Sequence, residues 1–104
     1  MRQPIKREIW ITPGDPQGIG PEVTAKALKK LPKDFYKKFS VIVVGPKSAF
    51  HKLPTPSNLF WIEPSGKTPG EQSAEAVFIA ASEVLRSPKM RALVTGPISK
   101  ARIQ

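Results

Sequence analysis

The sequence predicts an α/β fold, with a mainly parallel sheet and helices on both faces of that sheet. Short apolar and β-branched runs alternate along the chain with longer segments whose apolar residues recur at helical spacing. The segments between successive strands are too long for hairpins, and parallel strands require such crossover connections. A chain of 104 residues is expected to form one α/β unit over residues 1–104.

The first strand is expected over residues 5–11, which carry spaced isoleucines and end before a Pro-Gly pair. A turn-rich segment then leads into a helix. Gly20 is expected at the cap of this helix and Pro21 at its first position, where the missing N–H costs nothing. Three apolar residues of the helix are spaced four apart and are expected to form its apolar face for the sheet: Val23, Ala27 and Leu31.

The second strand is expected over residues 41–44, which are β-branched throughout, as is typical of a strand buried on both faces of a parallel sheet. Residues 47–53 are expected to form a short helix and residues 59–62 a brief third strand. The longest helix is expected over residues 71–86, which contain neither Pro nor Gly, and the fourth strand over residues 92–95. The apolar face of the longest helix is expected at Ala74, Val77, Ala81 and Val84 or Leu85.

The chain carries 17 Lys and Arg against 8 Asp and Glu, a formal charge of +9 that favours a polyanionic or phosphorylated partner. Many of the lysines lie in and just after the first predicted helix, without interleaved aromatic residues, which is typical of a solvated helix face. We therefore expect no specific nucleic-acid partner. A small basic nucleic-acid-binding module is the alternative from a different functional class.

The sequence contains no Cys, which excludes a disulfide scaffold and any thiolate metal site. Its longest apolar run, Ala76–Ala81, has six residues, whereas a membrane span needs about 20. The basic N-terminus is followed by an apolar run too short for a signal peptide. A cytoplasmic protein without a membrane partner is expected.

Two loops follow predicted strands and are expected to open on the carboxyl edge of the sheet, where ligands collect in parallel folds. The first, residues 12–22, fits neither GxGxxG nor GxxxxGK[ST]. Gly18 and Gly20 would allow close approach by a ligand, and the following helix presents unpaired N–H groups. Asp15 suits a hydroxyl, an amine or a metal better than a phosphate. The alternative is a stiff turn whose Pro and Gly residues serve geometry alone.

The second loop, residues 95–100, offers the Thr95 hydroxyl, backbone donors and the Lys100 ammonium, which together would hold a phosphate or polarise a carbonyl. Taken alone, Lys100 is more often a solvated surface residue. His51, the single histidine, has no partner at ligand spacing and is a poor metal candidate. These residues assign neither a catalytic residue nor a metal ligand.

Both loops resemble those of a known family. ITPGDPQGIGPE and ALVTGPISK, with PGEQSAEAVFIAASEVL between them, are similar to segments of the NAD-dependent 4-hydroxythreonine-4-phosphate dehydrogenases of vitamin B6 biosynthesis. The similarity runs in chain order from Ile9 to Ile103. Gln17 departs from the family pattern, which often has a smaller side chain there.

The resemblance implies a two-domain fold like that of the isocitrate and isopropylmalate dehydrogenases, assembled as a homodimer. It also implies oxidation and decarboxylation of 4-phosphooxy-L-threonine, with hydride transfer to NAD and a divalent Zn, Mg, Mn or Co ion bound by histidines. Asp15 with the Gly18 to Gly20 backbone, and Thr95 with Lys100, would form parts of the cleft wall.

Family members continue beyond TGPISK to a GHTE segment that contacts substrate and to three metal-binding histidines. The chain is therefore expected to be the N-terminal portion of such an enzyme. By itself it is expected to be inactive and to bind neither NAD nor metal. A relative that acts on another phosphorylated four-carbon hydroxy acid, such as a threonate phosphate, is an alternative.

Overall fold

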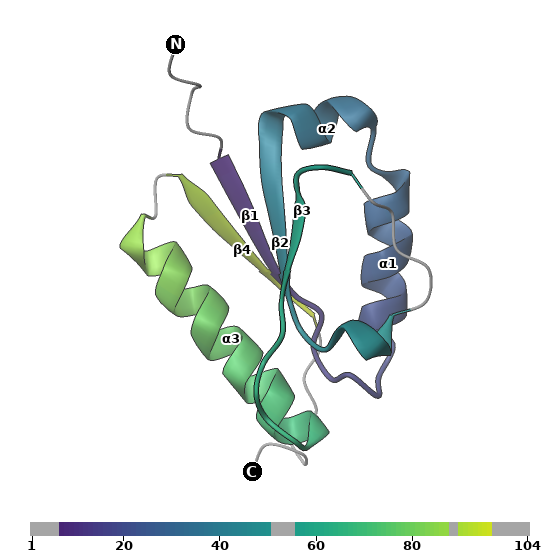
Figure 1. The fold of residues 1–104 in the computed structure, drawn as a ribbon, viewed down its shortest axis with the longest axis vertical. Coiled ribbons are helices and arrows are strands. Elements are labelled where there is room, and N and C mark those ends of the chain that lie inside the picture. Colours follow the sequence, from purple (N-terminus) through teal and green to yellow (C-terminus); the bar gives the residue numbers. More distant parts are fainter. Residues whose placement is uncertain (1–6, 51–55, 88–89, 97–104) are drawn as a thin grey trace.

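Four strands form one sheet in the order β3-β2-β1-β4, and every neighbouring pair is parallel (Figure 1). The structure is a computed structural model that describes residues 7–50, 56–87 and 90–96. The strands are β1 (Arg7–Thr12), β2 (Phe39–Val44), β3 (Leu59–Ile62) and β4 (Arg91–Thr95). The predicted α/β class and parallel sheet are confirmed, and each predicted strand lies within a residue or two of its expected place.

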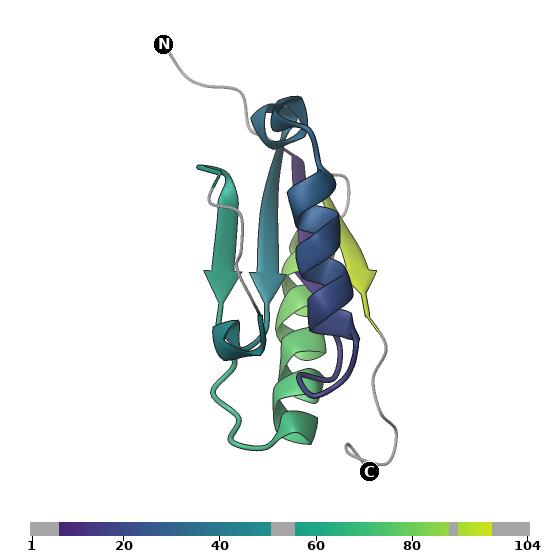
Figure 2. The same cartoon turned by 90° about the vertical axis from the view of Figure 1, so that its right-hand side faces the viewer.

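Helices cover both faces of the sheet. The helices are α1 (Gly20–Lys30), α2 (Lys33–Lys38) and α3 (Pro69–Arg86), with a short 3-10 helix, η1, at Lys47–Ala49. Figures 1 and 2 show α1 on one face of the sheet and α3 on the opposite face. Of the helix expected over residues 47–53, only Lys47–Ala49 are helical among the described residues, and residues 51–53 lie outside them. Phe50 leaves the helical conformation and packs its ring edge-on against Trp61, with the ring centroids 4.7 Å apart.

On the α1 face, Val41 and Val43 of β2 are fully buried beneath Leu28 and Tyr36. The Tyr36 hydroxyl donates to the Leu28 carbonyl oxygen at 2.8 Å, which joins α2 to the end of α1. Half-buried apolar residues surround this cluster: Ile11, Leu31, Phe35, Phe50, Leu59 and Trp61. The α1 face of β2 is therefore closed by large side chains.

The predicted sheet-facing side of α1 is wrong at Val23 and Ala27, whereas Leu31 is half-buried and packs against the cluster. Pro21, Ala25 and Leu28 are buried, whereas Val23 is 57% exposed and Ala27 is exposed. A spacing of four drifts by about 40° per step around a helix of 3.6 residues per turn, so such a stripe slants away from a flat sheet. The helix also begins one residue early, because Ile19 is already in the right-handed helical region and serves as the cap.

On the α3 face, small residues allow the helix to approach the sheet closely. Ala76 and Ala80 lie against Trp10, Ile42 and Val44 in one buried cluster. The predicted apolar face of α3 is wrong at Ala74, which is exposed, but Val77 and Ala81 are half-buried, and Val84, the alternative to Leu85, packs against this cluster. Trp10 supplies the bulk of the cluster from the sheet, with the half-buried Ile79 and Val84 packed around it.

At the amino edge of the sheet, Arg91 joins three elements. Its Nε lies 2.6 Å from Glu8 Oε1 of β1, and its Nη1 lies 3.2 Å from Glu83 Oε2 of α3. Its guanidinium also lies 6.0 Å from the ring centroid of Trp10, whose indole N–H donates to Glu8. The Arg91 side chain is only 23% exposed, so β4 begins at a well-shielded ionic cluster.

Candidate functional site

The carboxyl ends of β1 and β4 lie side by side at the point where the chain connections reverse direction. From β1 the chain passes through α1 to β2 on one side, whereas α3 carries the chain from β3 back across to β4 on the other side (Figure 1). Open parallel sheets bind ligands in the crevice outside the strand ends at such a switch point. The topology therefore makes this edge the candidate site.

The two loops that the sequence singles out meet here, as the parallel sheet predicts. Thr12 and Thr95 are register partners, and the Gly96 amide donates to the Thr12 carbonyl oxygen at 2.6 Å. A Cβ atom on either Gly20 or Gly96 would overlap the Pro13 carbonyl oxygen. Gly96 is therefore required by close backbone packing that joins the two loops, and Gly20 by close packing within the first loop.

Asp15 shapes the first loop. Its side chain is almost fully buried, and its Oδ1 accepts a hydrogen bond from the Gln17 amide at 2.9 Å. Its carbonyl oxygen accepts a second from the Gly18 amide at 2.9 Å. This pattern is that of an Asx turn, in which the carboxylate fixes the local backbone. Gly18 itself is exposed, and an added Cβ there would come no closer than 3.4 Å to Asp15.

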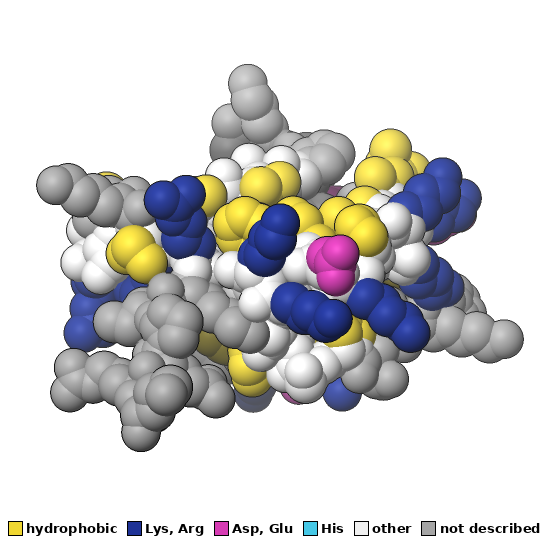
Figure 3. All heavy atoms as spheres, turned by 90° about the horizontal axis from the view of Figure 1, so that it is seen from above, with side chains coloured by type: hydrophobic (Ala, Val, Ile, Leu, Met, Phe, Trp, Pro, Cys, Tyr) yellow, Lys and Arg dark blue, Asp and Glu magenta, His cyan; other side chains and the backbone are white. Residues whose placement is uncertain are grey.

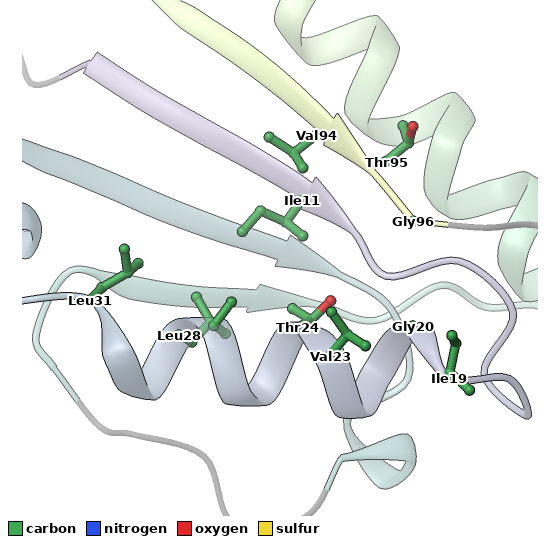
Figure 4. Close-up of a pocket in the computed structure, with 11 residues that line it drawn as sticks. Ile11, Ile19, Gly20, Val23, Thr24, Leu28, Leu31, Val94, Thr95 and Gly96 are labelled. Carbon is green, nitrogen blue, oxygen red and sulfur yellow. The ribbon is translucent and has the colours of Figure 1, made fainter.

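A cavity of about 390 Å³ runs from these loops along α1, between that helix and β4 (Figure 4). Ile11 and Val94 form its sheet side, and Val23, Thr24 and Leu28 form its helix side. Its volume lies within the range of small-molecule pockets. The other lining residues are Ile19, Gly20, Ala27, Leu31, Thr95 and Gly96. The sequence analysis missed this groove, because it assigned the stripe from Val23 to Leu31 to packing against the sheet.

Few polar groups are available near this groove. Thr95 is exposed at the end of β4, and no side chain hydrogen-bonds to the cap of α1. Thr12 Oγ1 is buried and has no hydrogen-bond partner among the described residues. Lys100 and His51 lie outside the described residues. Within residues 7–50, 56–87 and 90–96, no group of three or more His, Cys, Asp or Glu side chains is arranged to hold a metal ion.

Comparisons with known proteins do not identify a family. No protein-family model matches the chain, and no match was found among curated proteins. The assignment of function therefore rests on the motif segments and on the geometry of the edge where two of them lie. Among the helices that the structure describes, none is long and apolar enough to cross a bilayer.

Proposed function

We propose that the chain is the N-terminal part of an NAD- and divalent-metal-dependent dehydrogenase that oxidises and decarboxylates 4-phosphooxy-L-threonine as a homodimer. One observation carries the proposal. The described parts of the two family-like segments are distant in sequence, yet Gly96 of the second packs against Pro13 of the first at the switch point of the sheet, and its amide donates to the Thr12 carbonyl oxygen. A binding edge made by the two segments is what a dehydrogenase cleft requires.

In this proposal the chain supplies positioning and charge stabilisation rather than the reacting groups. The start of α1 presents backbone N–H groups that favour an anionic group of the substrate. The exposed Thr95 hydroxyl would donate beside it, and the Lys100 ammonium would add a compact positive charge. Asp15 would keep the first loop in the shape that this approach needs, through its bond to the Gln17 amide.

The metal site belongs, in this proposal, to the part of the enzyme that follows TGPISK. The resemblance assigns the histidine ligands to that following part, and among the described residues no group of three or more His, Cys, Asp or Glu side chains is arranged to hold a metal ion. When bound, the metal would polarise the substrate hydroxyl and stabilise the enolate left by decarboxylation, and NAD would accept the hydride. The 104-residue chain alone is therefore expected to be inactive.

The test uses two proteins: the 104-residue chain, and a chimera in which this chain replaces the matching N-terminal portion of a family enzyme. With 4-phosphooxy-L-threonine, NAD and Mg²⁺, Mn²⁺ or Zn²⁺, we expect NADH at 340 nm from the chimera and none from the chain. A threonate phosphate would serve as the second substrate. A chimera that melts cooperatively but reduces no NAD with either substrate would contradict the proposal, and so would NADH formation by the chain alone.

The described surface gives less support to the alternative function, a small basic nucleic-acid-binding module. Viewed from above, Lys and Arg side chains lie among hydrophobic ones, and little acidic surface is visible (Figure 3). Lys26 and Lys37 form exposed pairs with Glu22 and Asp34, at 3.3 and 3.7 Å. At physiological salt we expect only non-specific DNA binding, with a Kd of about 10⁻⁴ to 10⁻⁶ M. Submicromolar, sequence-selective binding in fluorescence anisotropy would favour the module instead.

A further inference from the structure

Helix α3 is apolar on two opposite sides. Its inner side packs small residues, Ala76 and Ala80, against the sheet. Its outer side exposes large ones: Phe78 is 73% exposed and Leu85 is 75% exposed. In Figure 1, α3 lies at the outside of the molecule, with no described segment over its outward side. Large apolar side chains exposed along one side of a helix mark an interaction surface, and no described residue covers this outer side.

The outer residues have the spacing of a helix-pairing seam. Ala74, Phe78, Ala81 and Leu85 follow each other at intervals of four, three and four, the a and d pattern of a heptad repeat. Ala74 is exposed and Ala81 is half-buried. We call these four residues the α3 seam. Along it, a small residue alternates with a large one.

We propose that the α3 seam binds the α3 seam of a second copy of this chain, with the two helices antiparallel. A two-fold axis midway between Phe78 and Ala81 places each Phe78 opposite the partner's Ala81, and each Leu85 opposite the partner's Ala74. Every large side chain then faces a small one, as close packing of two helices requires. A symmetric interface of this kind uses the same patch on both subunits.

The charges on α3 favour the antiparallel orientation. Its first turn contains Glu71 and its last turn contains Arg86. In an antiparallel pair, the acidic first turn of each copy lies near the basic last turn of the other, and the helix dipoles oppose each other favourably. A parallel pair would bring like charges together at both ends. The helix carries three glutamates against one arginine, so most of the chain's positive charge lies elsewhere.

The size of the seam sets the expected affinity. A helix of 18 residues is about 27 Å long, and one helix pair buries less than the standard interface of about 1,600 Å². We therefore expect a weak, reversible dimer. Two chains of +9 repel each other at long range, so added salt should strengthen this apolar contact.

The first experiment is sedimentation equilibrium of the 104-residue chain from 5 μM to 1 mM, at low and at moderate salt. We expect a monomer–dimer equilibrium, at least a tenfold loss of association in Phe78→Glu, and no loss in Val23→Glu. Val23 is the matched control, because it is also an exposed apolar helix residue but lies outside the seam. A chain that stays monomeric at 1 mM would overturn the proposal. Association that survives Phe78→Glu, or that Val23→Glu abolishes, would do the same.

The second experiment tests the antiparallel orientation of the two helices. The chain contains no Cys, so no disulfide other than the engineered one can form. We expect an equal mixture of Ala74→Cys and Leu85→Cys proteins to form a mixed disulfide under mild oxidation. Ala74→Cys alone should not crosslink, because an antiparallel pair separates the two copies of residue 74 by about 17 Å along the axis. Efficient crosslinking of Ala74→Cys alone would indicate a parallel pair and contradict the proposed geometry. This interface does not depend on the proposed dehydrogenase activity, which neither experiment measures.

Discussion

At the amino edge of the sheet, β4 is held by charged side chains, and at the carboxyl edge it is held by backbone packing. Arg91 contacts Glu8 and Glu83 at the first edge. At the second edge, the Gly96 amide donates to Thr12, and Gly20 and Gly96 both lie against the Pro13 carbonyl group. Each edge joins β4 to β1, and a pocket lies beside each contact, of about 390 Å³ at the carboxyl edge and about 340 Å³ at the amino edge.

This difference gives the two edges different chemistry. At the amino edge, Glu8 and Arg91 line the pocket and already pair with each other. Glycines close the carboxyl edge without occupying the space beyond it, so backbone donors and the Thr95 hydroxyl stay near an open apolar groove. The carboxyl edge should consequently tolerate substitution least where its glycines lie.

The largest expected effect is at the glycines. Gly96→Ala and Gly20→Ala should each lower the free energy of unfolding by at least about 3 kcal/mol, because an added Cβ would overlap the Pro13 carbonyl group. Gly18→Ala in the same loop is the control and should change it by less than about 1 kcal/mol, since its nearest contact would be an ordinary 3.4 Å. Urea unfolding measures all three. Equal effects at Gly18 and Gly96 would show that backbone packing does not close this edge.

A smaller loss is expected at the amino edge. Arg91→Ala should lower the free energy of unfolding by about 1 to 3 kcal/mol, because it leaves Glu8 and Glu83 partly shielded without their cation. Arg86→Ala removes an ion pair to the same Glu83, but the Arg86 side chain is 74% exposed. Arg86→Ala is therefore the control and should lower the free energy of unfolding by at most about 0.5 kcal/mol. Equal losses of the free energy of unfolding in Arg91→Ala and Arg86→Ala would contradict the role given to the ionic cluster at the amino edge.

The smallest stability effect is expected at Tyr36, which lies just before β2 begins. Burial raises the pKa of its hydroxyl above 10.0, so the unfolded chain loses this proton first as the pH rises. The stability that Tyr36 provides is complete below pH 10 and declines above it. Tyr36→Phe, which loses the bond to the Leu28 carbonyl, should cost about 1 kcal/mol at pH 8. The difference in the free energy of unfolding between Tyr36→Phe and wild type should become smaller by pH 11. A difference that stays constant would contradict a raised pKa of Tyr36 in the folded chain.

The strands and their parallel pairing could be predicted from the sequence, because β-branched runs such as 41–44 separated by long connections allow few other arrangements. The buried sides of the helices could not. Both α1 and α3 carry two apolar sides, and periodicity does not say which one meets the sheet. In α1 the position of Gly20 against Pro13 decides it, and in α3 the bulk of Trp10 does.

The expected parallel sheet was enough to predict that the two loops meet at one edge. Neither the turn made by Asp15 nor the apolar groove could be predicted from the sequence, for different reasons. Asp15 was open to both a ligand and a turn, and its carboxylate accepts a hydrogen bond from the Gln17 amide, which supports the turn. The groove was missed because its lining alternates between α1 and β4, which no sequence window spans.

The most direct test of the carboxyl edge as the binding edge is kcat/KM of the chimera carrying Thr95→Val, with 4-phosphooxy-L-threonine as substrate. Thr95 is exposed, so this isosteric change should leave the melting temperature unchanged. Loss of a hydroxyl that bonds a charged group costs about 1.5 to 3 kcal/mol, so we expect kcat/KM to fall at least tenfold. An unchanged kcat/KM in a folded Thr95→Val chimera would contradict the assignment of substrate binding to this edge.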